Sequence, residues 1–160
     1  MKVIKIESSF TVYDDLNELP IDIIDLMQYA VEARKNAYAP YSNFQVGAAI
    51  LLDNGEIVIG SNQENAAYPS GMCAERTAIF YASARYPNAK FLKMALTAGS
   101  VEHESNSPIP PCGACRQAIS EYEIKQESPI EIYFMGVKGK VIKSDSLADL
   151  LPLAFDKSFL

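Results

Sequence analysis

The sequence predicts an α/β domain in which helices pack on a mixed β-sheet. From residue 44 onwards, predicted strands and helices follow one another in the order β-β-α-β-α-β-β, and this interleaving is typical of a sheet layer covered by helices. Apolar residues make up 49% and charged residues 21% of the 160 residues, as is ordinary for a soluble globular protein. A chain of this length forms one domain with room for a substantial core.

Two elements are predicted ahead of this series. Residues 3–13 alternate weakly between polar and apolar side chains, and this pattern predicts an N-terminal strand. Pro20 suits the first turn of a helix. Apolar residues then recur at helical spacing, namely Ile24, Met27 and Val31. This helix is expected to end near residues 36–39, because Pro40 disfavours helical geometry in the residue before it.

A β-hairpin opens the series. Residues 44–52 and 56–60 are predicted to pair as antiparallel strands, because Asp53-Asn54-Gly55 between them is typical of a tight turn. The next elements are a loop at 62–72, a helix that opens at Cys73 and ends before Pro87, and a strand at 91–98. A loop at 99–111, a helix from Cys112 to about Tyr122, strands at 130–135 and 141–142, and a short helix at 146–151 follow. Ser144 or Asp145 is the expected N-cap of the last helix.

All three cysteines lie in two short stretches, Cys73-Ala74-Glu75-Arg76 and Pro111-Cys112-Gly113-Ala114-Cys115-Arg116. The C-x-x-C spacing places Cys112 and Cys115 on one face of a first helical turn. Thiolates in this pattern are typical zinc ligands in a reducing compartment. Three protein ligands leave one tetrahedral position open for water, which indicates a catalytic zinc site.

Glu75 stands two residues after the first cysteine, so its carboxylate is expected near the open position without being a ligand. There it can move the protons of a water whose pKa zinc lowers. Cys-x-Glu followed by Pro-Cys-x-x-Cys is also the pattern of zinc-dependent nucleobase deaminases. Three thiolates on Zn²⁺ leave a charge of 2 − 3 = −1. Two helix N-termini and Arg76 or Arg116 can offset it, although surface solvation is the alternative for both arginines.

Two other interpretations of the cysteines remain. Free cysteines also pack as small, inert hydrophobic side chains, but that interpretation leaves Glu75 and the Pro-Cys-x-x-Cys stretch without a role. A structural zinc site with His103 as the fourth ligand is the second alternative. His103 is the only histidine and lies in the polar stretch 102–107, which favours a solvated loop residue.

Composition narrows the possible partners. No apolar run approaches the roughly 18 residues of a membrane span, and the start of the chain lacks the apolar core of a signal peptide. Three cysteines suit neither a disulfide framework nor secretion, so a cytoplasmic protein is expected. The net charge of −6 argues against a long nucleic-acid footprint, which requires a basic stripe. A small neutral molecule is therefore the expected partner, with neither nucleic acid nor membrane.

Four stretches together resemble the small, homotetrameric cytidine deaminases. They are Tyr41-Ser42-Asn43-Phe44-Gln45-Val46-Gly47-Ala48-Ala49, Asn62-Gln63-Glu64-Asn65-Ala66-Ala67-Tyr68-Pro69, Cys73-Ala74-Glu75-Arg76-Thr77-Ala78-Ile79 and Pro111-Cys112-Gly113-Ala114-Cys115-Arg116-Gln117. The resemblance covers roughly residues 21–155. It implies a three-layer α/β/α fold, with helices on both faces of a mixed, five-stranded sheet. Residues 20–160 would form the single cytidine deaminase domain, and residues 1–19 an N-terminal extension with a possible extra strand.

The resemblance implies hydrolytic deamination of cytidine and deoxycytidine to uridine and deoxyuridine, with release of ammonia, as in pyrimidine salvage. Cys73, Cys112 and Cys115 would hold one zinc ion per chain, with Arg76 beside them. Glu75 would take a proton from the zinc-bound water, deliver it to N3 of the ring and later serve the departing ammonia.

Seven residues match substrate-binding positions of the family: Phe44, Asn62, Glu64, Ala66, Tyr68, Ala74 and Phe155. Asn62 and Glu64 match the ribose-binding pair, and a carboxylate there accepts from hydroxyls and repels phosphate. Phe44 lies beside the nucleoside in the family, and the backbone N–H at Ala74 meets the base carbonyl. In a tetramer with shared active sites, the ring of Phe155 would stack on the base of a neighbouring subunit, where Tyr68 can also contribute. Core packing is the alternative for both phenylalanines.

Three positions depart from the family pattern. Gln63 stands where an aliphatic residue is usual, Pro110 where serine is common, and Leu153 where glycine is frequent. In an extended segment Gln63 points away from its two neighbours. Pro110 can still offer a carbonyl to the substrate amine, whereas Leu153 affects where Phe155 is placed.

Other functions remain as alternatives. A blasticidin-type or other small-heterocycle deaminase can use the same scaffold, but Asn62-x-Glu64-Asn65 favours a nucleoside because it supplies partners for hydroxyls. A polynucleotide deaminase fits less well, since such enzymes usually carry histidine as the first ligand and this chain is acidic. The non-enzymatic alternative is a zinc-stabilised oligomeric module.

Overall fold

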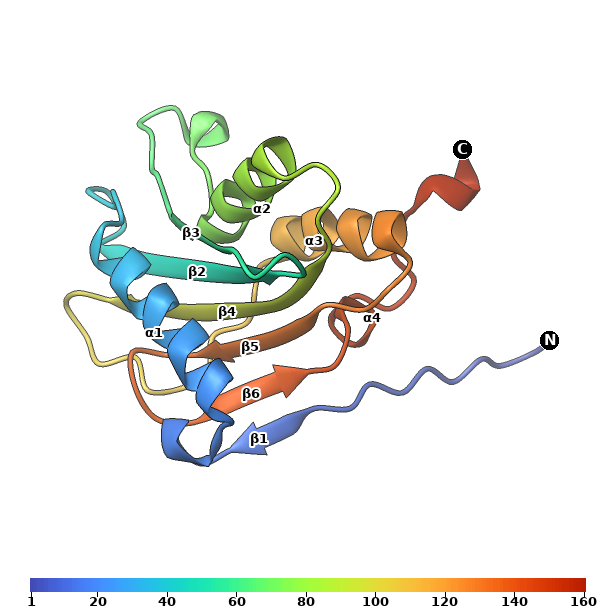
Figure 1. The fold of residues 1–160 in the computed structure, drawn as a ribbon, viewed down its shortest axis with the longest axis horizontal. Coiled ribbons are helices and arrows are strands. Elements are labelled where there is room, and N and C mark those ends of the chain that lie inside the picture. The colour runs from blue at the N-terminus through green and yellow to red at the C-terminus, as the bar shows by residue number, and fades with distance from the viewer.

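A six-stranded mixed sheet runs through the middle of the molecule, with helices on both faces (Figure 1). In the computed structural model, which describes residues 1–160, the strand order is β1-β6-β5-β4-β2-β3. The strands are β1 (Thr11–Tyr13), β2 (Phe44–Leu52), β3 (Ile57–Ser61), β4 (Phe91–Ser100), β5 (Glu131–Met135) and β6 (Val141–Ser144). Only β4 and β5 pair in parallel, and every other neighbouring pair is antiparallel.

Four α-helices cover the sheet: α1 (Ile21–Lys35), α2 (Ala74–Arg85), α3 (Gly113–Gln126) and α4 (Leu147–Leu150). Successive residues of a strand point to opposite faces, and they divide the core into two clusters. Ala48 and Ile50 pack in the larger cluster with residues of α2, α3 and α4. Ala49 and Ala95 pack in the smaller cluster with residues of α1. The predicted three-layer α/β/α architecture is therefore confirmed.

The expected number of five strands is wrong, because β1 adds a sixth at the edge. Thr11, Val12 and Tyr13 pair antiparallel with Lys143, Ile142 and Val141 of β6. This strand lies in the stretch where the alternation of residues 3–13 predicted one, but it is only three residues long. The partner strand β6 is itself only four residues long, so residues 1–10 extend past it without a ladder.

Several boundaries differ from the sequence prediction by a few residues, and the clearest differences concern the helices α3 and α4. The helix expected to end at about Tyr122 continues to Gln126, since no proline or glycine interrupts it, and stops where Glu127 adopts φ 53°. The N-cap of α4 is Ser146, whose hydroxyl accepts from the Ala148 backbone N–H at 3.0 Å. Ser144 is buried and donates to the Ser146 carbonyl oxygen instead.

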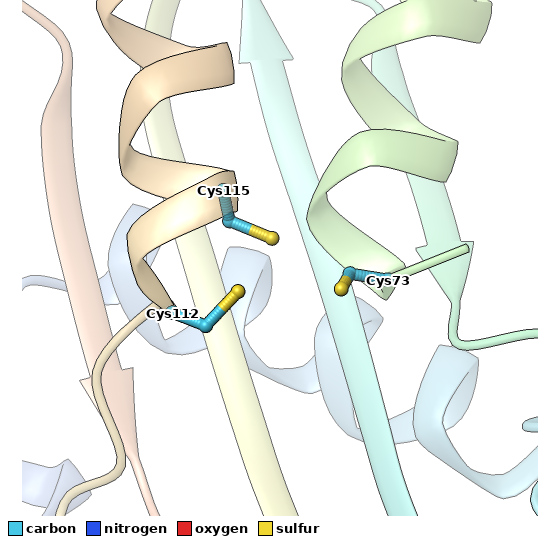
Figure 2. Close-up of side chains that lie close together, drawn as sticks. All are labelled: Cys73, Cys112 and Cys115. Carbon is cyan, nitrogen blue, oxygen red and sulfur yellow. The ribbon is translucent and has the colours of Figure 1, made fainter. Parts of the chain in front are cut away.

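The helices α2 and α3 begin side by side on the same face of the sheet (Figure 1, Figure 2). Gly60 of β3 lets α2 approach closely, because a Cβ there would lie 2.5 Å from the Ala74 carbonyl oxygen and 2.7 Å from the Ala78 nitrogen. No side chain other than hydrogen fits in that space. No helix of the molecule has both the length and the apolar character that crossing a membrane would require.

Candidate metal centre and active site

The three cysteines converge where α2 and α3 begin (Figure 2). Cys73 is the N-cap of α2, Cys112 is the N-cap of α3, and Cys115 lies in the first turn of α3. Their Sγ atoms all lie within 4.8 Å of one another. The structure thus brings together three thiols that stand 39 and 3 residues apart in the sequence.

The donor set fits zinc. Thiolates are preferred zinc ligands, and three of them leave a coordination position free for water or substrate. Cys115 is fully buried whereas Cys112 is exposed, so the cluster lies at the floor of an opening to the surface. Neither His103 nor Glu75 belongs to the cluster. His103 is exposed in the loop that follows β4, which disfavours the alternative of a four-ligand structural site.

Arg76 is the cation that faces the sulfur atoms. Its Nη2 donates to Sγ of Cys73 at 3.5 Å, and its buried Nε has no hydrogen-bond partner. The pKa of Cys73 is lowered to about 5, first by the hydrogen bond from the Cys115 thiol and then by the Arg76 guanidinium. Arg116 points elsewhere and donates to the carbonyl oxygens of Pro111 and Leu150, both at 2.8 Å. Of the two candidate arginines, only Arg76 contacts a ligand sulfur.

Glu75 is a buried carboxylic acid at the same place. Glu75 is 5% exposed, and together with Cys73 and Cys112 it lines a cavity that opens to the surface. Burial is the main cause of a raised pKa of this carboxyl, with the Cys73 thiolate adding to it. A carboxyl with a raised pKa holds a proton more readily, which suits a group that accepts and donates protons during a reaction.

A cavity of about 370 Å³ opens above this group. Predicted substrate-binding residues Phe44, Asn62, Glu64 and Tyr68 line it, as does Arg76. Asn65 and the family departures Gln63 and Pro110 also line it. The rest of the wall consists of residues to which no role was assigned from the sequence: Val46, Gly71, Met72, Leu96, Ala98 and Ile109. Strand register explains part of this set, since Val46 lies two residues after Phe44 on the same face of β2 and pairs with Ala98.

The amide of Asn62 is bound to the backbone of β2. Its Nδ2 donates to the Phe44 carbonyl oxygen at 2.9 Å, and its Oδ1 accepts from the Val46 N–H at 2.8 Å. This side chain therefore extends the pairing of the strand that carries Phe44. Asn62 fixes one wall of the cavity in addition to lining it.

The carboxylate of Glu64 is held by the turn that precedes β2. One oxygen accepts from the backbone N–H groups of Tyr41 and Ser42, at 3.0 and 3.2 Å, and the other accepts from the Ser42 hydroxyl. The Ser42 hydroxyl is the main cause of a lowered pKa of this carboxyl. Glu64 is thus an ionised acceptor at the rim of the cavity.

Three predicted binding residues do not line this cavity. Ala66 is exposed in the loop, and Ala74, the first residue of α2, is fully buried. Phe155 is 59% exposed and stacks on Phe159, with ring centroids 5.7 Å apart. Tyr68, which does line the cavity, is 81% exposed.

Comparisons of sequence and of structure with known proteins agree with one another. The family model for the cytidine and deoxycytidylate deaminase zinc-binding region matches residues 21–128. The cytidine deaminase of Halalkalibacterium halodurans is 40% identical over 130 residues, covering 81% of this chain and 91% of the relative. That of Sporosarcina psychrophila is 40% identical over 140 residues, covering 88% and 96%. The crystal structure of the Burkholderia pseudomallei cytidine deaminase matches with a TM-score of 0.70 at 41% identity, covering 82% of this chain and 97% of that one. The chain belongs to the cytidine deaminase family.

Proposed function

We propose that this chain is a zinc-dependent cytidine deaminase, which hydrolyses cytidine and deoxycytidine to uridine and deoxyuridine and releases ammonia. One observation carries the proposal: Cys73 and Cys112 of the three-thiol cluster line the same cavity as the buried carboxyl of Glu75. The sugar-binding candidates Asn62 and Glu64 lie on the wall of that cavity. The family match supports the same reaction.

Cys73, Cys112 and Cys115 hold one zinc ion per chain in this proposal, and Arg76 offsets the surplus negative charge of the three thiolates. Bound zinc lowers the pKa of a water molecule to about 7 and so supplies the nucleophile. The first turns of α2 and α3 point their free backbone N–H groups at the same place, which further favours the thiolate forms.

Glu75 transfers the two protons of the attacking water. It takes one proton from the attacking water and delivers it to N3 of the base. It then takes the second proton of that water and delivers it to the exocyclic amine, which leaves as ammonia. The C4–N bond is thereby replaced by a carbonyl, and Glu75 returns to its starting state. One buried carboxyl in contact with the cavity suffices for both transfers.

The walls of the cavity orient the nucleoside. Phe44 offers an aromatic face to the base, while Asn62 and Glu64 bind the sugar hydroxyls. Glu64 is suited to this role because its carboxylate is ionised and accepts only. The backbone N–H at Ala74 meets the base carbonyl, and Ala66 and Tyr68 complete the binding residues.

The assembly we propose is a homotetramer with shared active sites, in which Phe155 of one chain covers the base bound by another. The exposure of this ring on the single chain supports that role. We further propose pyrimidine salvage in the cytoplasm, where the reducing conditions keep three thiols available to zinc.

The test is the loss of ultraviolet absorbance as purified, zinc-loaded protein converts cytidine to uridine, measured beside its metal content. We expect turnover of cytidine and deoxycytidine and one zinc per chain. Cytosine, blasticidin S and a cytosine-containing oligonucleotide are the comparison substrates. Preference for blasticidin S or for the oligonucleotide would replace the proposal with the corresponding deaminase, and zinc without any turnover would favour a structural module.

A further inference from the structure

The segment that carries Phe155 has little regular structure of its own. It leaves α4 at Leu151 and runs as residues 151–156 to a short 3₁₀ turn at Lys157–Phe159. Leu153 within it has φ 59°, in the left-handed region that favours glycine. A segment with such a backbone needs outside contacts to keep one conformation.

Two neighbouring side chains of α3 provide contacts at both ends of this segment. Nη1 of Arg116 donates to the Leu150 carbonyl oxygen at 2.8 Å, at the root of the segment. Nε2 of Gln117 donates to the carbonyl oxygen of Phe155 itself, also at 2.8 Å. Both acceptors are backbone atoms, so these contacts fix the path of the chain and do not engage the phenylalanine ring, which stacks on Phe159.

These two residues directly follow Cys115 in the chain. The same stretch of α3 therefore contributes one thiol to the metal cluster and both anchors of the C-terminal segment. Arg116 also donates through Nε to the carbonyl oxygen of Pro111, the residue before Cys112. Thus the position of the segment is tied directly to the position of the metal centre.

We infer that Gln117 is a positioning residue, which sets where Phe155 is presented to a neighbouring active site. The inference rests on the proposed role of Phe155. On the single chain that ring is exposed and lies outside the cavity, so its useful placement depends on the backbone to which it is attached. The donor group of Gln117 determines that placement, and Arg116 holds the root.

Gln117 is the better residue to test, because Arg116 also contacts the loop next to Cys112. In Gln117→Ala we expect KM for cytidine to rise about two- to tenfold, the range given by one neutral hydrogen bond. Zinc content and kcat should stay near the wild-type values. Gln117→Glu keeps the size of the side chain but cannot donate when ionised, and it should show the same rise. The matched control is Gln28→Ala on α1, whose amide donates only to Glu32.

A double-mutant cycle separates positioning from general stability. If Gln117 acts through Phe155, adding Gln117→Ala to Phe155→Ala should raise KM no further. Additive losses would make Gln117 merely structural and overturn the inference. If Phe155→Ala lowers activity but Gln117→Ala keeps the wild-type KM, the inference about Gln117 is overturned while the role of Phe155 stands. Full activity of Phe155→Ala would remove the role of the ring and this inference with it, while cytidine turnover by the wild type would still support the proposed function.

A second readout does not depend on activity. The chain contains no tryptophan, so Phe155→Trp places its single tryptophan in the segment, and this residue can be excited selectively over tyrosine. We expect Gln117→Ala in that background to lower the fluorescence anisotropy of the tryptophan, because the segment loses an anchor. Gln28→Ala should leave it unchanged. Equal anisotropy with and without the Gln117 amide would contradict the inference.

Discussion

The guanidinium of Arg76 donates to Sγ of Cys73 at 3.5 Å, while its own Nε is buried without a partner. The half-buried cation is thus held next to a metal ligand at the wall of the cavity. We predict that Arg76→Gln weakens zinc binding about 10- to 100-fold, the usual effect of removing a group that supports a metal ligand. Competition with a chelator measures this. The control is Arg85→Gln in the last turn of the same helix, and an equal affinity in both variants would contradict the role of Arg76.

Glu75 should be required for turnover but not for zinc. Glu75→Ala and the isosteric Glu75→Gln are predicted to lower kcat by at least about 10²-fold, because positioned proton transfer contributes roughly 10²–10⁴ and this carboxyl serves more than one transfer. Metal analysis should still give one zinc per chain, since Glu75 is not in the thiol cluster. Activity within about tenfold of wild type would exclude Glu75 as the proton carrier.

Glu64 should determine the recognition of the sugar. Glu64→Gln is predicted to raise KM for cytidine far more than for free cytosine, because only the nucleoside has hydroxyls to donate to the carboxylate. Ser42→Ala should produce a weaker effect of the same kind, since the Ser42 hydroxyl donates to Glu64. Glu56→Gln, at the exposed hairpin turn, is the control. Similar losses on cytidine and cytosine would place Glu64 outside the sugar site.

The metal centre could be predicted from the sequence because its residues form a pattern, Cys-x-Glu followed by Pro-Cys-x-x-Cys, although Cys73 and Cys112 stand 39 residues apart. The C-x-x-C spacing and the loop before α2 determine where the thiols point, and the structure brings all three together. The contacts of Arg116 and Gln117 could not be predicted, since their acceptors are backbone carbonyls that leave no pattern in the residue types. The contact of Ser42 with Glu64 joins segments 22 residues apart and likewise has no periodic signal.

The fold likewise has features that the sequence predicts and features that it does not. Periodicity and turn residues predicted the order of the elements, because each of these features acts within a few residues. The expected number of five strands was wrong, because Thr11–Tyr13 can pair only if the edge of Val141–Ser144 is free. That strand lies far away in the chain. The N-cap of α4 was misplaced because Ser144 is drawn into the core, which leaves Ser146 to cap the helix.

The N-terminal extension should divide into a dispensable part and a stabilising part. Residues 1–8 are exposed, whereas Leu19 is 5% exposed and packs in the cluster with α1. Deleting residues 1–8 should change Tm little. Deleting residues 1–19 also removes β1 and Leu19, and a buried leucine alone contributes about 1.5–3 kcal/mol. We expect that deletion to lower Tm by at least about 5 °C, and calorimetry measures both. Equal Tm values would show that the extension does not support the core.

Phe155 and Glu75 should be able to come from different chains in one active site. Homo-oligomers with closed symmetry can share sites in this way, and Phe155 lies outside the cavity of its own chain. Phe155→Ala should therefore lower activity without loss of zinc, and Glu75→Ala should still present an intact ring to its neighbour. Refolding the two variants together is predicted to create some sites with both wild-type groups. The mixture should then exceed the summed activity of the variants refolded separately.

A second mixture provides the matched control. Glu75 and Glu64 line the cavity of one chain, so mixing Glu75→Ala with Glu64→Gln cannot assemble a wild-type site and should remain additive. Native mass spectrometry must show mixed oligomers in both cases. If mixed oligomers form and the Phe155→Ala mixture is also merely additive, Phe155 acts within its own subunit or has no part in the site. If both mixtures exceed additivity, oligomer formation itself restores activity and the shared ring is not its cause.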